Sequence, residues 1–475
     1  MRLRVVASAI ALALGTGCGG PGSVGPVAPG SVASGPSKDG VTRGSLVANA
    51  RLVGARRIGA LLAGDAVRGV AFANDGDVVV TGSFEDTVDF GGTRLTSRGG
   101  SDVFVAKYAR TGTLRWVRRF GGSKTDRGQS VALLPDGSIF VAGSFMATAD
   151  FGKKELTTAG NGGASDLFVS RLAPSGTPEW TRALGNDADD GGFSLAVDER
   201  GVVVAGVLGK SDGAATTPGI GRDTDALVAA WTLVGDRSWQ KTFGNAGTDL
   251  AGAVALDAAG DAYVLSDFAL PVPAAGGIAG TGPHALTLTK LGRDGSVRWE
   301  SSVGCESMVN PEAVVVAKDG AVHFAGSLYA NATWNGTTIE VPGAGAGLVG
   351  SVSREGKRTN LVTVRSSGGA SLTALAVDTK GRVVAGGHGD GTLDVAGHPF
   401  EGRALYTFFV GPGGTASDVA FLPVKKDADR IARIVATDDA VALVGTLASE
   451  VALAKGVAPL LELGGTDGFL GVFAR

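Results

Sequence analysis

A short apolar run that ends in glycine recurs along this 475-residue chain at a regular spacing. The runs read VVVTG, IFVAG, VVVAG, VHFAG, RVVAG and ALVG, and a related run, AYVLS, stands between the third and the fourth. Their last residues are 59 to 63 positions apart: Gly82, Gly143, Gly206, Ser266, Gly326, Gly386 and Gly445. Seven copies of one motif at a fixed period predict a repeat protein, which can form a single domain of this size.

Each copy carries segments that predict four short strands. An apolar stretch and an Asp-Gly turn precede the glycine-ended run, as in VALLPDGSIFV, and such turns supply the positive φ that tight hairpins need. A longer connection, a strand such as SDVFVAKY and a strand such as LRWVRRFGG follow. The 78 glycines and the 44% of apolar residues agree with many short strands joined by tight turns. Each unit is therefore expected to be a four-stranded antiparallel meander.

Seven such units without helices between them predict an all-β, seven-bladed β-propeller. Residues 52–65 resemble a fourth strand placed ahead of the first unit, and the seventh unit stops at Arg475, after its third strand. We therefore expect the N-terminal strand to complete the last blade, which closes the ring and leaves no open sheet edge. The propeller is predicted to cover residues 50–475 and to be a monomer.

The pattern DGDVVVTGSF…TVDFGG…GGSDVFVAKYARTGTLRWVRRFGG resembles the bacterial SBBP-type β-propeller repeat. The similarity is strong in the first two units, recognisable in the third, fourth and seventh, and eroded in the fifth and sixth. The resemblance implies the propeller fold and an envelope or secreted location. It implies no particular activity, because one fold hosts many functions.

The first 49 residues predict export and a lipid anchor. Two arginines precede an apolar run that is too short to span a bilayer, as in a signal peptide. The following GTGC resembles a bacterial lipobox, although Gly15 stands where leucine is usual. Residues 1–17 are expected to be removed, Cys18 to be lipidated, and residues 18–49, rich in Gly, Pro and Ser, to form a tether. The expected location is the bacterial cell envelope, with the membrane as a partner; without lipidation the protein would be secreted.

Charge and cysteine content exclude other classes of protein. A formal net charge of −3 offers no basic surface for nucleic acid. Cys18 and Cys305 are the only cysteines, so a disulfide framework is excluded, and Cys305 is expected to be structural. No residue pattern indicates a cofactor, a metal site or a catalytic set, and none is expected.

One face of the predicted disc is the candidate binding face. It carries the long connections between the second and third strands of the units and the connections that lead into the next unit. Trp334, in such a connection but outside the repeat pattern, is a candidate sugar or protein contact. His388, Asp390 and His398 lie together in GGHGDGTLDVAGHPFEG, whose spacing matches no metal motif. Solvated loop histidines are favoured there over a metal site.

Two other residue types recur at fixed places in the units and are expected to be structural. Tryptophans of the fourth strands are expected to pack between blades rather than to bind sugars: Trp116, Trp180, Trp239 and Trp299. Aspartates of the loops that enter each unit suit Ca²⁺ in principle, but turn capping or binding of backbone amides is favoured because the spacing of a calcium loop is missing: Asp65, Asp126, Asp187, Asp189, Asp190 and Asp249.

Two hypotheses of function follow. The first is a non-catalytic, lipid-anchored propeller that binds an envelope protein or a glycan with its long-loop face. The second is a propeller hydrolase or lyase with its site on the same face. Two or more titratable groups that converge in a pocket would favour the enzyme.

Overall fold

The computed structural model describes residues 41–43, 47–59, 64–160, 163–210, 224–244, 247–269, 283–455, 459–460 and 465–475. The predicted signal peptide, Cys18 and most of the predicted tether lie outside these residues. Among the described residues there is no helix long and apolar enough to cross a bilayer. Their one helical element is a short 3-10 turn, η1 (Pro412–Gly414).

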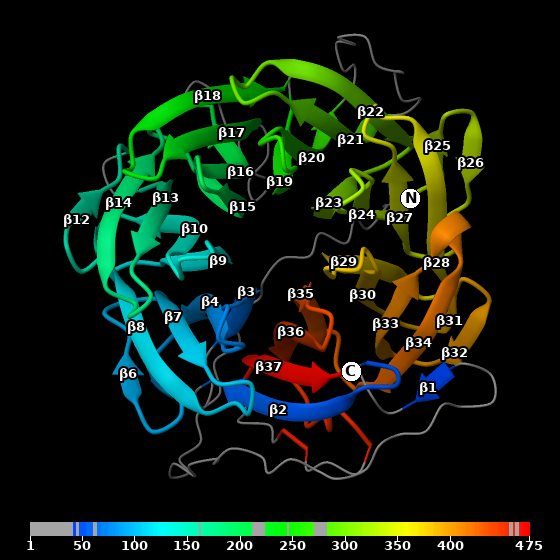
Figure 1. The fold of residues 1–475 in the computed structure, drawn as a ribbon, viewed down its shortest axis with the longest axis horizontal. Helices are drawn as coiled ribbons and strands as arrows, with labels where there is room; N and C mark the ends of the chain where they lie inside the picture. The colour runs from blue at the N-terminus through cyan, green and yellow to red at the C-terminus, as the bar shows by residue number, and fades with distance from the viewer. Residues whose placement is uncertain are drawn as a thin grey trace, which may run out of the picture.

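Seven antiparallel sheets stand around a common axis, and the first strand of each unit is innermost (Figure 1). Blade 1 contains β3 (Ala66–Phe72), β4 (Val78–Phe84), β7 (Asp102–Tyr108) and β8 (Leu114–Gly122). Blade 2 contains β9 (Arg127–Leu133), β10 (Ile139–Met146), β13 (Ser165–Leu172) and β14 (Pro178–Leu184). Blade 3 contains β15 (Gly191–Asp198), β16 (Gly201–Gly209), β17 (Thr224–Thr232) and β18 (Arg237–Phe243).

The other four blades follow the same order of strands. Blade 4 contains β19 (Leu250–Leu256), β20 (Ala262–Ala269), β21 (His284–Leu291) and β22 (Val297–Cys305). Blade 5 contains β23 (Val309–Val316), β24 (Val322–Leu328), β27 (Ala346–Val352) and β28 (Arg358–Ser366). Blade 6 contains β29 (Ala370–Val377), β30 (Val383–Gly389), β33 (Ala404–Val410) and β34 (Ala416–Pro423). Blade 7 contains β35 (Arg430–Ala436), β36 (Ala440–Leu447), β37 (Asp467–Ala474) and β2 (Arg51–Ile58). The predicted seven-bladed, all-β propeller is confirmed.

The repeated glycine lies where the two inner strands of a blade approach each other most closely. In blade 2 the inner strand has a β-bulge opposite this position, and Gly128 pairs with Gly143 there. A Cβ atom on Gly143 would lie 1.9 Å from the carbonyl oxygen of Arg127, so a side chain cannot fit unless the strands separate. This close approach explains why the period is marked by glycine.

Blade 6 corrects one position of the predicted period. Leu372 of its inner strand pairs with Gly387 at the bulge, so Gly387 and not Gly386 corresponds to Gly143. A Cβ atom on Gly387 would lie 2.0 Å from the carbonyl oxygen of Ser371, which is the same close approach. Because Gly386 and Gly387 are adjacent, the sequence alone does not show which of the two occupies the repeated glycine position.

The repeated tryptophans pack between blades, as predicted. The Trp180 ring lies 6.0 Å from the Phe140 ring, and its Nε1 donates a hydrogen bond to the carbonyl oxygen of Leu233 in blade 3 (2.9 Å). A Cβ atom on Gly235, in the last turn of blade 3, would lie 2.9 Å from the indole. The same close contact between a tryptophan and a turn glycine of the next blade occurs three more times: Trp116 with Gly176, Trp239 with Gly295 and Trp299 with Gly356.

Three of the long connections are hairpins that join the sheet of the preceding blade, rather than loops. The three pairs of strands are β11 (Thr148–Asp150) with β12 (Glu155–Thr157) on β8, β25 (Ala332–Trp334) with β26 (Thr337–Ile339) on β22, and β31 (Thr392–Val395) with β32 (His398–Glu401) on β28. Three sheets therefore have six strands, and each hairpin pairs with two or three residues at one end of the outer strand. A fourth hairpin, β5 (Thr87–Asp89) with β6 (Arg94–Thr96), forms a two-stranded sheet of its own.

The two ends of the chain close the ring in blade 7, as predicted. β2 pairs antiparallel with β37 and is the outermost strand of that blade (Figure 1). The ordered part begins earlier than residue 50, however, because β1 (Val41–Arg43) pairs in parallel with β34 of blade 6. Val47 and Ala48 are also buried. Residues 41–43, 47 and 48, which were predicted to belong to a tether, are therefore part of the folded structure.

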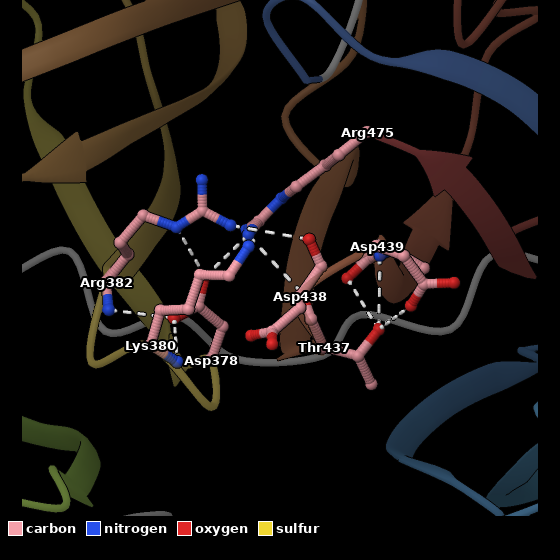
Figure 2. A network of polar contacts seen from close by, with 8 residues as sticks. Asp378, Lys380, Arg382, Thr437, Asp438, Asp439 and Arg475 are labelled. Carbon is pink, nitrogen blue, oxygen red and sulfur yellow. Dashed lines mark hydrogen bonds and ion pairs between the residues drawn. The ribbon is translucent and has the colours of Figure 1, made fainter.

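A polar network joins the end of the chain to blade 6 (Figure 2). Asp378, in the first turn of blade 6, accepts hydrogen bonds from Arg382 Nε (2.6 Å) and Arg475 Nη1 (2.8 Å). Arg475 Nη1 also donates to the carbonyl oxygen of Thr437 in blade 7 (3.4 Å), and its guanidinium lies over the Phe409 ring, 4.7 Å from the centroid. One side chain thus holds β37 against both blades.

Replacing Arg475 by alanine is expected to lower the free energy of unfolding by about 1–2 kcal/mol, because the buried Asp378 carboxylate loses one of its charged partners. Denaturant titration followed by circular dichroism measures the change. Arg354→Ala serves as the control, since Arg354 lies in an exposed turn of blade 5. A variant Arg475→Ala as stable as the wild type would show that the network does not contribute to closure.

Candidate functional site

A pocket of about 240 Å³ opens between blades 5, 6 and 7. Residues from three kinds of segment line it: the ends of second strands, the connections that follow them, and the connections that enter blades 6 and 7. These segments belong to the predicted long-loop face. The lining side chains that carry polar groups are Tyr329, Ser371, His388, Asp390, Arg403, Asp427, Asp429 and Arg430.

Of the four tentative binding residues, the structure brings two together at this pocket. His388 lies in β30, not in a loop as expected, and Asp390 follows directly after that strand; both line the pocket. His398 is the first residue of β32, on the hairpin attached to blade 5, and does not line it. The three residues of the predicted loop are therefore separated by the hairpin fold.

Trp334 is fully buried, so the expectation that it contacts a partner is wrong. Its ring lies 5.4 Å from the Phe324 ring, and its Nε1 donates a hydrogen bond to Ser301 Oγ (3.3 Å). Trp334 ends β25, the strand by which the hairpin attaches to blade 4. The side chain supplies apolar contact between the hairpin and the blades.

His388 is neutral and lacks a hydrogen-bond partner at one nitrogen. Burial, and then the nearby Arg430 guanidinium, lowers the pKa of His388 to about 4. Its Nδ1 atom is inaccessible to solvent and has no partner in the part of the chain that the structure describes. Because Nδ1 is closed to solvent, a ligand or water in the pocket can reach only the other ring nitrogen of His388.

The carboxylates of the pocket are engaged with protein groups. Asp390 Oδ2 accepts a hydrogen bond from Arg403 Nη2 (2.7 Å), and the same guanidinium forms an ion pair with Asp427. Asp429 accepts hydrogen bonds from the amide of Ala448 (2.6 Å) and from Ser449 Oγ (2.5 Å). Arg403 is therefore neutralised, and Asp429 is held as a turn cap.

Asp429 was not among the aspartates predicted to be structural, but it makes the corresponding contact in blade 7. Asp126 Oδ1 and Oδ2 accept hydrogen bonds from the amides of Met146 (3.0 Å) and Gly122 (2.7 Å), which joins the outer strand of blade 1 to the second strand of blade 2. The same contact to the end of a second strand recurs at Asp65 with Glu85, Asp190 with Gly209 and Asp249 with Ala269. The predicted structural role is confirmed for these four. Asp189 instead binds the amide of Ser165, and Asp187 is exposed.

Three candidate functional residues were not predicted from the sequence. Arg430 follows Asp429 directly, is exposed, and its guanidinium forms no hydrogen bond or ion pair within the described parts of the chain. Tyr329 and Met308, both on blade 5 at this face, are 39% and 59% exposed and belong to the few large apolar side chains at the surface. Only the position of Arg430 after a capping aspartate, as Arg127 follows Asp126, carried a signal in the sequence.

The remaining histidines and Cys305 have structural surroundings. His284 Nδ1 lies 3.1 Å from Asp267 Oδ1, and His323 Nδ1 lies 2.8 Å from Ser351 Oγ. Cys305 is buried, in agreement with the expected structural role. No group of three or more His, Cys, Asp or Glu side chains placed to hold a metal occurs among the residues described here.

Comparison with known proteins supports the fold class and leaves the function open. No family model matches the chain, so the resemblance to the SBBP-type repeat stays a prediction. The regulatory protein FlaEY of Caulobacter vibrioides is 30% identical over 180 residues, which are 36% of this chain and 18% of that protein. The chain thus matches less than a fifth of that relative's length.

Solved structures show the same kind of architecture at low identity. The WD40 β-propeller domain of Doa1 covers 88% of this chain and 97% of its own (TM-score 0.42, 11% identity). The Pan2 WD40 domain of Neurospora crassa covers 88% and 95% (TM-score 0.40, 10% identity), and virginiamycin B lyase of Staphylococcus aureus covers 88% and 98% (TM-score 0.41, 9% identity). The strand pairing places the chain in the class of β-propeller repeat proteins. At such scores the neighbours carry no argument about activity.

Proposed function

We propose that the protein is a lipid-anchored propeller of the bacterial envelope that binds a partner through its long-loop face without catalysing a reaction. One observation supports the proposed binding function. The polar pocket, lined by His388 with its unpartnered imidazole nitrogen, lies on the same face as the exposed side chains of Met308 and Tyr329. Exposed aromatic and methionine side chains beside a pocket are typical of binding surfaces.

The engaged carboxylates support a binding role over a catalytic one. Asp390 and Asp427 share Arg403, and Asp429 accepts several hydrogen bonds, so none of them is placed as a general base. His388 is the one remaining candidate base at the pocket. The enzyme alternative keeps one specific observation in its favour, since His388, Tyr329 and Arg430 do converge there.

The anchor rests on the lipobox-like GTGC segment and the Gly- and Pro-rich residues behind it. Mass spectrometry of the mature N-terminus tests it. A diacylglyceryl group on Cys18 is the expected result, and an unmodified cysteine would replace the anchor by secretion.

Capture of envelope material by the mature protein tests the binding function. We expect the wild type to retain a partner, and the double variant Met308→Ser, Tyr329→Ser to lose at least about tenfold of that retention, because exposed apolar anchors dominate interfaces. Val234→Ser is the matched control. Val234 is 67% exposed, but it lies in the turn between β17 and β18, on the opposite face.

Equal loss in the Val234 variant, or retention by the double variant, would assign binding to another surface. For the enzyme alternative, His388→Gln separates the two functions. It would abolish turnover of a bound substrate in an enzyme, whereas a binding protein shows no turnover with either chain.

A further inference from the structure

We propose that the pocket between blades 5, 6 and 7 binds a carboxylate-bearing sugar, a hexuronate unit of an acidic glycan. This inference rests on the proposed binding function of the long-loop face and specifies its ligand.

One cation of the pocket is available for an anionic group. Arg403 is shared by Asp390 and Asp427, whereas Arg430 is exposed at the pocket wall and its guanidinium has no hydrogen-bonded partner among the described residues. A guanidinium binds a carboxylate through two parallel hydrogen bonds, which is the strongest polar contact the pocket can offer. Glu312 also lies near Arg430, but burial raises the pKa of Glu312 to about 7, so this carboxyl is only partly charged at neutral pH.

The His388 side chain is best matched by a ligand group that can both donate and accept a hydrogen bond. Its Nδ1 is closed to solvent, so the other ring nitrogen is the one that can meet a ligand in the pocket, and the ring is neutral because burial and the Arg430 charge keep its pKa low. A neutral imidazole has one donor and one acceptor nitrogen. A sugar hydroxyl matches either role, whereas a carboxylate matches only a donor.

The other polar groups favour a polyhydroxylated ligand over a simple anion or an acidic peptide. Tyr329 OH accepts a hydrogen bond from Asn310 Nδ2 (2.9 Å) and is also hydrogen-bonded to the Ser371 side chain, so these two hydroxyl groups form a polar pair at the pocket wall. Asp427, largely exposed, offers carboxylate oxygens that accept from hydroxyl groups. Acetate or an acidic side chain supplies no hydroxyl donor for these oxygens, and inorganic phosphate, which does carry a P–OH donor at neutral pH, also brings up to two negative charges that the Asp427 carboxylate repels. The volume of about 240 Å³ is small for a ligand pocket and suits a single sugar ring.

Isothermal titration of the mature protein with four probes tests the inference. The probes are glucuronate, glucose, acetate and inorganic phosphate, so that the ring and the negative charge are presented together and separately. We expect glucuronate to bind at least about tenfold more tightly than each of the others, because a charged hydrogen-bonded pair contributes about that factor or more.

The variant Arg430→Gln is expected to lose at least about tenfold in affinity for glucuronate. Arg430 is exposed, so the fold is expected to persist, and an unchanged thermal midpoint confirms that. Arg298→Gln makes the same charge change on the outer strand β22, away from the pocket, and should bind glucuronate like the wild type.

Two results would overturn the inference: no binding of glucuronate, or binding of phosphate or acetate as tight as that of glucuronate. Either can occur while the wild type still retains an envelope partner, in which case the proposed binding function stands and only the ligand class is wrong. If glucuronate binds but no envelope partner is captured, the inference about the ligand stands and the proposed binding of an envelope partner is wrong.

Discussion

Replacing Asp102 by asparagine is expected to stabilise the propeller by about 2 kcal/mol at pH 8 and to leave its stability at pH 4 almost unchanged. Asp102 Oδ1 is buried and has no hydrogen-bond partner in the described chain, while Oδ2 accepts from the amide of Arg98 (3.0 Å). Asp102 Oδ1 and Asp126 Oδ2 lie 2.7 and 2.8 Å from the point where a Cβ atom on Gly121 would be. Two carboxyl groups thus approach the same point beside Gly121. Gly122 N donates to Asp126 Oδ2 (2.7 Å), and Arg119 Nε lies 3.6 Å from Asp102 Oδ2.

The pKa of Asp126 determines how the stability of the wild type changes with pH. Burial raises the pKa of Asp126 from 3.8 to about 7, and the Asp102 carboxyl adds to the rise. Between these two values the folded protein binds a proton that the unfolded chain does not, so the free energy of unfolding falls as pH rises from about 4 to 7. An asparagine at 102 would remove the Asp102 charge, which is the smaller cause of the raised pKa of Asp126, and so would remove part of that loss, while the effect of burial stays.

A second pair provides a replicate. Asp166 Oδ1 is likewise buried without a partner among the described residues, and its Oδ2 accepts from the amide of Ala159 (3.0 Å). Burial, with a contribution from Asp166, raises the pKa of Asp190 to about 6. Asp166→Asn should therefore act in the same direction over a narrower pH range.

Denaturant titrations at pH 4, 6 and 8 measure these effects. Asp187→Asn is the control, because Asp187 is exposed in the same kind of turn as Asp126. A stability difference between Asp102→Asn and the wild type that does not grow with pH would contradict the carboxyl-pair interpretation.

Replacing Arg57 by methionine is expected to cost about 3–5 kcal/mol, because it leaves a buried carboxylate without its cation. Arg57 Nε donates to Asp467 Oδ2 (2.5 Å), and the two side chains are 4% and 0% exposed. The guanidinium also donates to the carbonyl oxygens of Leu447 (3.4 Å) and Leu460 (3.3 Å). The pair joins β2 to β37, the strands that close the ring.

Arg51→Met is the matched control, since Arg51 is the exposed first residue of the same strand. Thermal and denaturant unfolding compare the two variants. The double variant Arg57→Met, Asp467→Leu should recover part of the loss, because an apolar pair avoids the buried charge. Equal stability of Arg57→Met and Arg51→Met would show that closure depends on the backbone pairing alone.

The architecture could be predicted because its signals repeat. A glycine such as Gly143 and a tryptophan such as Trp180 meet the same neighbours in successive blades, so their period reveals contacts that no single copy would show. The closure by the N-terminal strand followed from the same count. The strand pairing could be predicted from the repeat alone, without the resemblance to the SBBP-type repeat.

The candidate site was harder to predict because it does not repeat. From the sequence, Trp334 is expected in a loop, but the Asn335-Gly336 pair directly after it is a strong hairpin signal. In the structure both residues have positive φ (49° and 75°). His388 and Arg430 meet across two blades, and no local pattern records that proximity. The free Nδ1 of His388 is a property of packing and has no sequence signal.

The hairpins that attach to the preceding blade have a consequence for synthesis on the ribosome. In three blades, a hairpin of the next unit adds a short pairing at one end of the outer strand; in blade 1, β11 pairs with Gly121 and Gly122 of β8. These three blades are therefore completed only after part of the next unit has been made, so their assembly follows the order of translation. The pairing of β2 with β37 spans the longest separation of the described strands, since Arg57 and Asp467 are 410 residues apart, and it requires closing a loop of that length.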